Sequence, residues 1–369
     1  MTKKWVCAAV ILAAVFLCLS PQVTQAARGT PGTSEFGYGA DLSLAGPNFA
    51  EALNMANDLS LDWVDIQVPW QTYYPTADAV PDWSNLDQAI QYASENGISV
   101  LLSVTQAPSW ALGKNGPDAN LTLQFILELS KRYPSEINAY ELFPGANTRS
   151  GWGSEPDAKS YLKLFQSIKG QLKIINSDIL LVGGGLIPSS SDQNFDGQDD
   201  LAFLQNLYNS GANKVINILS IDLSDLTGDP LTPPDGNEHR ILRHYEEVRQ
   251  IMLKNNASNC LIWVTHLRFP SGTINKQDLI YNDLNNQTSW LTQAFSQLRS
   301  QLYIGVAFLG SLNPEKQSSS TQSWSLVGDG KDYQPFYSTF RDLISQNSPQ
   351  NILLKRGRPK SNVLVKRRT

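Results

Sequence analysis

The sequence contains little cysteine, with only three such residues among its 369. Cys7 and Cys18 belong to the N-terminal segment, so Cys260 is the only cysteine in the rest of the chain. This excludes a disulfide framework, and a lone thiol beside the apolar run Leu261–Trp263 is expected to pack in the core. Histidine is equally scarce, and two of the three residues fall on one expected helix. We therefore predict no metal site and no cofactor. The histidines are His239, His244 and His266.

Basic residues are scarce everywhere except at the two ends of the chain. Without the two lysines near the N-terminus and the seven Lys or Arg of the last fifteen residues, 20 basic residues face 34 acidic ones. Such an acidic body argues against a nucleic-acid partner, because phosphate contacts need clustered Lys and Arg. Residues 347–369 form a basic tail that we expect to be disordered. Contact of this tail with an anionic wall polymer or a membrane is the alternative.

Long hydrophobic runs are absent beyond the first 26 residues. There, Lys3 and Lys4 precede the apolar run Trp5–Leu19, and Thr24–Ala26 provides a small-residue cleavage site. This order of features is typical of a secretory signal peptide, with an uncleaved anchor as the alternative. We expect residues 1–26 to be removed and the remainder to be secreted or extracytoplasmic, without stable membrane insertion.

Residues 27–346 show eight short apolar runs that alternate with longer helical patterns. Such alternation is typical of βα units with a parallel sheet, and the length suits a single (β/α)₈ TIM barrel, an α/β fold. Functional side chains are then expected at the C-terminal ends of the strands. The predicted strands are Phe36–Leu42, Leu61–Val68, Ile98–Thr105, Ile137–Phe143, Ile179–Gly184, Val215–Leu223, Leu261–Thr265 and Leu302–Leu309. The predicted helices are Pro47–Leu59, Ser84–Glu95, Ala119–Tyr133, Glu155–Ile175, Leu201–Ser210, Glu238–Asn255, Gln277–Ser300 and Tyr333–Ile344.

The stretch Ile137–Trp152 resembles the fourth strand of the clan A glycoside hydrolases, the retaining cellulase- and xylosidase-like barrels. The run in that family is Tyr-Glu-x-Trp-Asn-Glu-Pro-Asn, and its second Glu is the general acid/base. Tyr140, Glu141 and Asn147 match this run, but Gly145 stands where the catalytic Glu is expected. The resemblance continues in four further runs, namely Trp63–Trp70, Leu102–Ala111, Ile262–Phe269 and Trp324–Tyr337.

The departures from the family pattern fall on its chemistry. Retaining hydrolysis needs two carboxyl groups about 5 Å apart. The resemblance places the nucleophile at His266 and the acid/base at Gly145, and neither residue carries a carboxyl group. Asp65 replaces a family Arg, and Asp222 with Ser224 replaces a His and a Tyr. The resemblance therefore implies a carbohydrate ligand and a loss of catalysis, that is, a glycoside hydrolase-like pseudoenzyme.

Two alternatives remain open at this point. An active O-glycosidase would need relocated carboxylates, Glu141 with Asp65 or Asp222, or Glu155 swinging into the site. Arg268 instead favours a buried structural network with Glu141 and Asp65. A structural or partner-binding protein is the second alternative, which a plugged cleft would favour.

Side chains just beyond the strand ends are the expected binding residues. Trp and Tyr rings stack on the C–H faces of sugars, while amides and charged groups hydrogen-bond their hydroxyls. Tyr73, Tyr74 and Gln106 belong to this group, and about half of its aromatic rings should be exposed in a groove. We predict that an oligo- or polysaccharide is held by Gln67, Trp70, Trp110, Asn147, Arg149, Trp152, His266 and Trp324.

Overall fold

The computed structural model describes residues 27–33, 35–45, 49–189, 195–224, 226, 229–268, 284–313, 326 and 336–347. The expected signal, residues 348–369 of the expected tail and Trp324 lie outside these residues. Within them, no helix combines the length and apolarity needed to cross a membrane.

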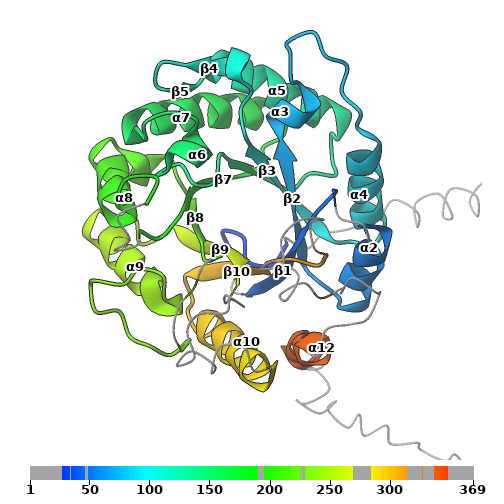
Figure 1. Ribbon diagram of the computed structural model, residues 1–369, viewed down its shortest axis with the longest axis vertical. Helices are drawn as coiled ribbons and strands as arrows, with labels where there is room; N and C mark the ends of the chain where they lie inside the picture. Colours follow the sequence, from blue (N-terminus) through cyan, green and yellow to red (C-terminus); the bar gives the residue numbers. More distant parts are fainter. Residues whose placement is uncertain are drawn as a thin grey trace, which may run out of the picture.

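Eight parallel strands close into one barrel, in the order β1-β2-β3-β6-β7-β8-β9-β10 around the ring (Figure 1). Each lies within about three residues of a strand expected from the sequence, so the predicted (β/α)₈ barrel is confirmed. The bounds are β1 Gly37–Leu42, β2 Trp63–Pro69, β3 Ser99–Thr105, β6 Ala139–Leu142, β7 Leu180–Leu186, β8 Ile218–Asp222, β9 Leu261–Leu267 and β10 Ile304–Leu309.

The helices surround the barrel (Figure 1). The long helices are α2 Phe49–Asp58, α4 Ser84–Glu95, α5 Ala119–Arg132, α7 Ala158–Ile175, α8 Asp200–Asn209, α9 Tyr245–Lys254, α10 Leu284–Arg299 and α12 Phe336–Asn347. The loops carry short elements that the sequence did not predict. These are α3 Trp70–Tyr73, α6 Arg149–Trp152, the hairpin strands β4 Leu112–Gly113 and β5 Gly116–Pro117, and the 3₁₀ turns η1 Ser109–Ala111, η2 Ala212–Lys214 and η3 Leu242–His244.

The prediction of a helix over 238–255 was wrong at its start. Helix α9 begins at Tyr245, and its first seven expected residues form a loop and the 3₁₀ turn. The Asp235 carboxylate accepts the backbone N–H groups of Asn237 and Glu238, which holds that segment in a turn. The contact between His239 and Asp200 then fixes the loop against α8. Tertiary hydrogen bonds thus override the local helical pattern.

The barrel interior changes from apolar to polar along its axis. Apolar side chains fill its N-terminal half, namely Trp63, Leu101, Ala139, Val182, Ile218, Trp263, Val306 and Phe308. The rings of Trp63 and Trp263 meet edge to face at 4.9 Å. Their indole N–H groups donate to the carbonyls of Arg28 and Gly29, so residues before β1 close this end. The inward positions nearer the C-terminal end carry Asp65, Ser103, Glu141 and Ser220, all buried.

The glycine run at the end of β7 permits a close backbone approach, as its sequence predicts. Gly185 has φ +50°, and a Cβ there would lie 2.4 Å from the Cα of Pro144. Its carbonyl accepts the N–H of Gly145 at 2.6 Å. A side chain at Gly185 would therefore push away the loop after β6 that carries Gly145.

Cys260 is the free thiol in the described part of the chain, and it is buried. Burial raises its pKa to about 12. A thiol in that state packs as a small apolar side chain, as predicted.

Candidate functional site

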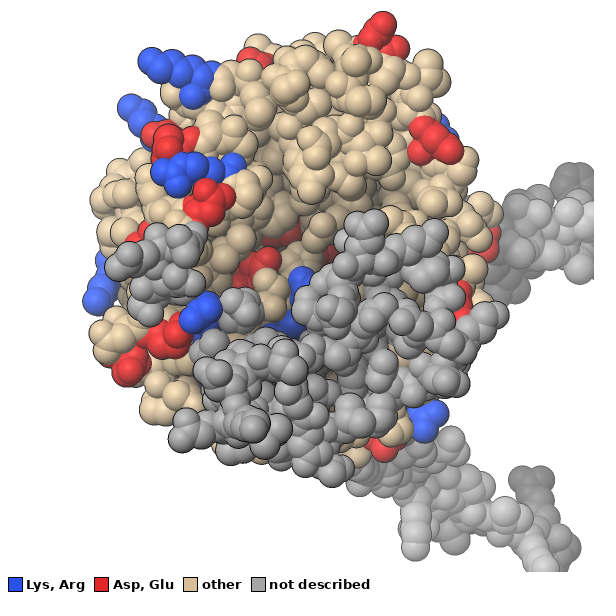
Figure 2. Space-filling view, in the orientation of Figure 1, with Lys and Arg blue, Asp and Glu red and all other residues tan. Residues whose placement is uncertain are grey.

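A cavity of about 660 Å³ lies at the C-terminal end of the barrel, where barrel proteins keep their ligands. Its volume suits a small organic ligand. Figure 2 shows a hollow at the centre of this face, with acidic and basic atoms visible inside it. The polar and aromatic residues that line the cavity are Asp41, Ser43, Asp65, Gln67, Thr72, Tyr73, Asp82, Asn85, Gln106, His266, Arg268 and Ser311.

His266, which replaces the family nucleophile, lies at the cavity floor in a fixed orientation. Its Nδ1 lies 2.6 Å from Asp41 Oδ2, and its Nε2 lies 3.9 Å from Asp65 Oδ2. Burial lowers the pKa of His266, but the charges of Asp41, Asp222 and Asp65 outweigh burial and raise it to about 10. The imidazole is therefore a cation at neutral pH, and it donates hydrogen bonds rather than attacking as a nucleophile.

Three non-glycine residues with a left-handed backbone lie at the ends of barrel strands. Gln106, Phe143 and His266 have φ values of +51°, +48° and +54°. Such a backbone costs about 1–2 kcal/mol per residue. Gln106 and His266 both line the cavity, so strain is concentrated where the fold presents side chains to a ligand.

A buried hydrogen-bonded chain runs beneath His266 from β2 to β8. Ser103 Oγ lies 2.7 Å from Asp65 Oδ1 and 2.9 Å from Glu141 Oε2. The hydroxyl of Ser220 accepts the N–H of Gly185 and donates to Glu141 Oε1 at 2.5 Å. Because Ser103 has one hydrogen and two carboxyl neighbours, it donates fully to only one of them, and protonation of the other carboxyl would satisfy both contacts.

The causes of the pKa shifts favour Asp65 over Glu141 as the protonated partner. Burial raises the pKa of Asp65 well above its usual range, and the charges of Asp41 and Glu141 add to this, against His266 and Ser103. Burial also raises the pKa of Glu141, but the hydroxyls of Ser220 and Ser103 oppose it. The proton order is therefore Asp65 to Ser103 to Glu141, with Glu141 accepting from both serines.

Several buried polar atoms at this floor have no hydrogen-bond partner within the described part of the chain. They include Asp41 Oδ1, Asp65 Oδ2 and Arg268 Nε. The expected network in which Arg268 pairs with Glu141 or Asp65 does not form, since no ion pair joins these described residues. Buried polar atoms without hydrogen-bond partners are costly, so this floor is a candidate site for a ligand.

Gly145, at the family's acid/base position, does not line the cavity. Gly145 has φ +78°, and a Cβ there would lie 3.1 Å from Ile187 and 3.2 Å from Thr148. Glu155 does not swing in, because its carboxylate pairs with Arg149 at 2.6 Å on the surface. Both side chains are more than half exposed, at 75% and 53%. Arg149, expected to bind ligand, therefore lies outside the cavity.

Most of the expected aromatic groove is core instead. Trp70 is buried and stacks on Phe125, and Trp152 is buried with its N–H donated to the Asn115 carbonyl. Trp110 is half-buried and packs edge to face on Trp70. The single-turn helices α3 and α6 turn these rings inward.

Asn147 and Tyr74, two further residues from the expected binding group, do not line the cavity. Asn147 is fully buried, where its amide joins Ile187 and Gln198. Tyr74 donates to Glu128. Tyr73 does line the cavity while stacking on Trp83 at 4.4 Å. Of the predicted binding residues, the structure brings Gln67, Gln106, Tyr73 and His266 together at the cavity.

Two groups of side chains have the composition of metal ligands. We call Asp41, Asp65 and His266 the floor cluster, and Asp200, His239 and His244 the loop network. Within each group the potential ligand atoms lie within 4.8 Å of one another. The sequence showed neither, because strands and loops distant in the chain bring the residues together. Asp82 and Asn85 of the cavity were also missed, since they come from the start of α4 rather than a strand end.

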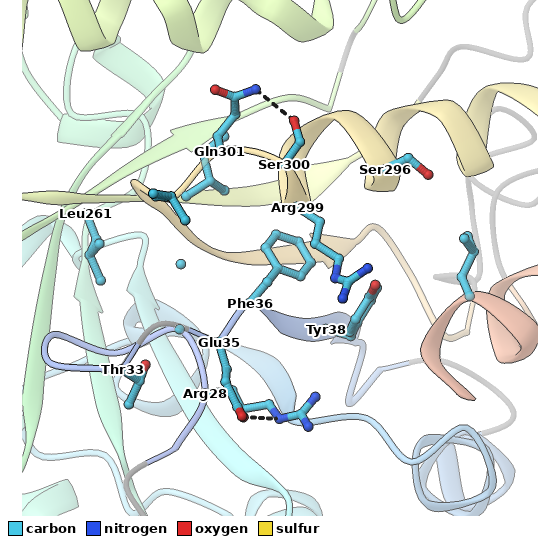
Figure 3. Close-up of a pocket in the computed structure, with 15 residues that line it drawn as sticks. Arg28, Thr33, Glu35, Phe36, Tyr38, Leu261, Ser296, Arg299, Ser300 and Gln301 are labelled. Carbon is cyan, nitrogen blue, oxygen red and sulfur yellow. Dashed lines mark hydrogen bonds and ion pairs between the residues drawn. The ribbon is translucent and has the colours of Figure 1, made fainter. Parts of the chain in front are cut away.

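A second cavity, of about 360 Å³, lies at the N-terminal end of the barrel (Figure 3). Some of its polar lining is already paired: Arg28 forms an ion pair with Glu35, and Gln301 donates a hydrogen bond to Ser300. This end of a barrel contributes to stability rather than to catalysis. We therefore place the candidate site at the C-terminal cavity.

Comparison with known proteins supports this fold assignment. No protein-family profile and no curated protein matches the sequence. A family 39 glycoside hydrolase from the gut symbiont Bacteroides cellulosilyticus WH2 has a TM-score of 0.64 at 15% identity, over 84% of this chain and 63% of that chain. A family 39 β-xylosidase from Caulobacter crescentus has a TM-score of 0.58 at 12% identity, over 88% and 73%. A thermostable mutant of a xylanase from Cellvibrio japonicus has a TM-score of 0.57 at 13% identity, over 84% of this chain and 97% of that chain.

These identities establish the fold alone. The chain shares the (β/α)₈ barrel fold of these glycoside hydrolases, and the resemblance to clan A is confirmed at the level of the fold. It spans less than two thirds of the first of these proteins.

Proposed function

We propose that the protein binds an oligo- or polysaccharide in the C-terminal cavity without hydrolysing it. The observation that carries the proposal is the loss of both carboxyl groups at the family positions, Gly145 and His266, from a barrel that keeps a ligand-sized cavity. Gln67, Gln106 and Asn85 supply amides for sugar hydroxyls, and Tyr73 supplies a ring. Residues 1–26 carry the expected signal, so the site would act outside the cytoplasm.

The relocated glycosidase loses support from the position of Glu141. This residue is fully buried, and both of its oxygens are engaged by Ser103 and Ser220. Asp222 accepts the N–H of Ser224 and borders a separate small cavity of about 110 Å³. A structural or partner-binding role is less supported than ligand binding, because the cavity is open space rather than filled by side chains.

One observation favours hydrolysis as a second candidate. Asp65 lines the cavity with a raised pKa, as a general acid would, and Asp41 lies beside it on β1. In this reading Asp65 donates a proton to the leaving group.

The test uses residues 27–369 with a panel of oligo- and polysaccharides over pH 4–8. Reducing-end release reports hydrolysis, and calorimetry reports binding. We expect binding without release, and we expect Arg149→Ala, which lies off the cavity, to bind as the wild type does. Turnover that disappears in Asp65→Asn but survives in Glu155→Gln would establish the second candidate. If no saccharide of the panel is bound and none is hydrolysed, both candidate functions are contradicted.

A further inference from the structure

We propose that the cavity floor binds a divalent transition-metal ion through His266 Nε2, Asp65 Oδ2 and the side-chain amide of Gln67. The inference replaces the expectation from sequence that no metal site exists. It rests on the orientation of one imidazole, the spacing of three side chains, and buried oxygens that lack partners.

The imidazole of His266 is held as a metal ligand would be. Its Nδ1 lies 2.6 Å from Asp41 Oδ2. Histidines that bind metals almost always donate their second N–H to a carboxylate, a carbonyl or water, which fixes the ring. Asp41 fills that role here, so Nε2 is the nitrogen left for an ion, which displaces the Nε2 proton into solvent when it binds. It is directed at Gln67 and Asp65.

The distances from His266 Nε2 to the other two groups suit a shared ion. The amide nitrogen of Gln67 lies 3.3 Å from His266 Nε2, and Asp65 Oδ2 lies 3.9 Å from it. Metal bonds of about 2.1 Å separate neighbouring ligand atoms by roughly 3.0–3.4 Å. Gln67 already meets this separation, and Asp65 needs to move by about 0.5 Å. The two ends of an amide have the same shape, so a half-turn of Gln67 presents its oxygen.

The carboxylates supply atoms that are otherwise unexplained. Asp65 is 1% exposed, and its Oδ2 has no hydrogen-bond partner among the described residues, while Oδ1 is held by Ser103. Asp41 Oδ1 is also buried and has no hydrogen-bond partner among the described residues. A buried carboxyl oxygen without a hydrogen-bond partner is unfavourable, and a metal ion that displaces the Asp65 proton and coordinates Oδ2 directly removes that cost, whereas His266 lies 3.9 Å away.

The donor set selects the class of ion. One imidazole nitrogen with carboxylate and amide oxygens suits Zn²⁺, Co²⁺ or Mn²⁺, whereas Ca²⁺ and Mg²⁺ prefer oxygen alone. Three protein ligands leave coordination positions open toward the cavity. Adjacent hydroxyls of a sugar would occupy them. Only this last step rests on the proposed function.

The test begins without any sugar. Chelator-treated protein of residues 27–369 is titrated with ZnCl₂ by calorimetry and with CoCl₂ by visible absorption. We expect one ion per chain, loss of binding in His266→Gln and Asp65→Asn, and affinity about 10–100-fold weaker in Asp41→Asn. The matched control is His244→Gln in the loop network, which should bind as the wild type does. Absence of binding by the wild type, or loss in His244→Gln alone, would overturn the assignment.

Gln67→Ala keeps the test valid if the buried variants fail to fold. Gln67 is exposed, so its replacement leaves the core intact, and we expect affinity for Zn²⁺ to fall about 10–100-fold. Unchanged affinity in a folded Gln67→Ala protein would contradict the ligand set. The saccharide panel is then repeated with and without ZnCl₂. Binding of sugar that does not depend on the ion would refute the metal–sugar step and leave the proposed function standing. Binding of the metal ion together with no binding of any saccharide would refute only the proposed function.

Discussion

The loop network and the floor cluster contain the same residue types, but they treat buried charge in opposite ways. In the loop network Asp200 Oδ1 accepts from the backbone of Ser189 and contacts His239, and Oδ2 contacts His244 at 2.6 Å. The second nitrogen of His244 contacts Glu247 at 2.9 Å. Both oxygens of Asp200 and both nitrogens of His244 are therefore satisfied.

In the floor cluster, by contrast, Asp41 and Asp65 each keep one buried oxygen that has no hydrogen-bond partner among the described residues. Three carboxyl groups raise the pKa of a single imidazole there. The difference is consistent with a stabilising role of the loop network for the loops after β7 and β8, and with the proposed binding of a ligand at the floor cluster. Substitutions should therefore affect stability in one region and binding in the other.

The largest effect is expected for Asp200→Asn. It leaves the buried His244 without its counter-charge, and removing one member of a buried ion pair costs about 3–5 kcal/mol of the free energy of unfolding. Urea denaturation at pH 6 measures this. The matched control is Asp199→Asn, one residue earlier, because Asn caps α8 as well as Asp does. An equal loss in both variants would show that negative charge near His239, which lies 3.6 Å from Asp199, and not the pairing of Asp200 with His244, is responsible.

The pH dependence of stability sharpens the same point. The pKa of His244 is raised from 6.5 to about 9, because Asp200 and Glu247 outweigh burial. Its contribution is therefore complete below pH 6.5 and is lost as pH rises toward 9. We expect the stability difference between the wild type and His244→Gln to shrink by about 2–3 kcal/mol over that range. His266 is present in both proteins, so its titration cancels. A difference that stays constant between pH 6 and 9 would contradict the network.

Low pH gives the opposite limit for the loop network. Hydrogen bonds and charge from His239 and His244 lower the pKa of Asp200 despite its burial. Its contribution is present above the ordinary pKa of 3.8 and is lost as pH falls below it. The network should therefore stabilise the fold most strongly between about pH 4 and 6.5.

Asp65→Asn should have the reverse sign. The raised pKa of Asp65 means that its ionisation opposes folding as pH rises, so removing the charge should stabilise the protein by about 0–2 kcal/mol. The gain should be larger at pH 8 than at pH 5. The Asn amide can still donate to Ser103, whereas Glu141→Gln puts an N–H donor against one of the two serine donors and should cost about 1–3 kcal/mol. Thermal unfolding of both variants checks the contrast.

The sequence predicted the barrel and part of its site for an identifiable physical reason. Alternation in β2 places Asp65 and Gln67 on one face, and parallel strands carry their C-terminal ends to one edge. His266 came from the resemblance of Ile262–Phe269 to a run of the family, and the structure places it at the cavity. The barrel, Gln67 and His266 were therefore accessible from local pattern.

Features that depend on how loops fold were not accessible in this way. Trp70 and Trp152 lie just beyond strand ends, but the turns of α3 and α6 direct their rings into the core. The loop network joins Ser189, Asp200 and His239 from three separate segments, and nothing in the spacing of these residues announces their contact.

The smallest effect on stability, and the clearest separation of the two regions, is expected for Gln67→Ala. Gln67 contacts His266 at 3.3 Å but is exposed, so the free energy of unfolding should change by no more than about 0.5 kcal/mol. Its loss removes a hydrogen-bonding group from the cavity, and saccharide affinity should fall about 5–10-fold, which corresponds to ~1 kcal/mol. Arg149→Ala, equally exposed but outside the cavity, should change neither quantity. Loss of stability without loss of affinity in Gln67→Ala would place the floor cluster with the loop network, as a structural element rather than a binding site.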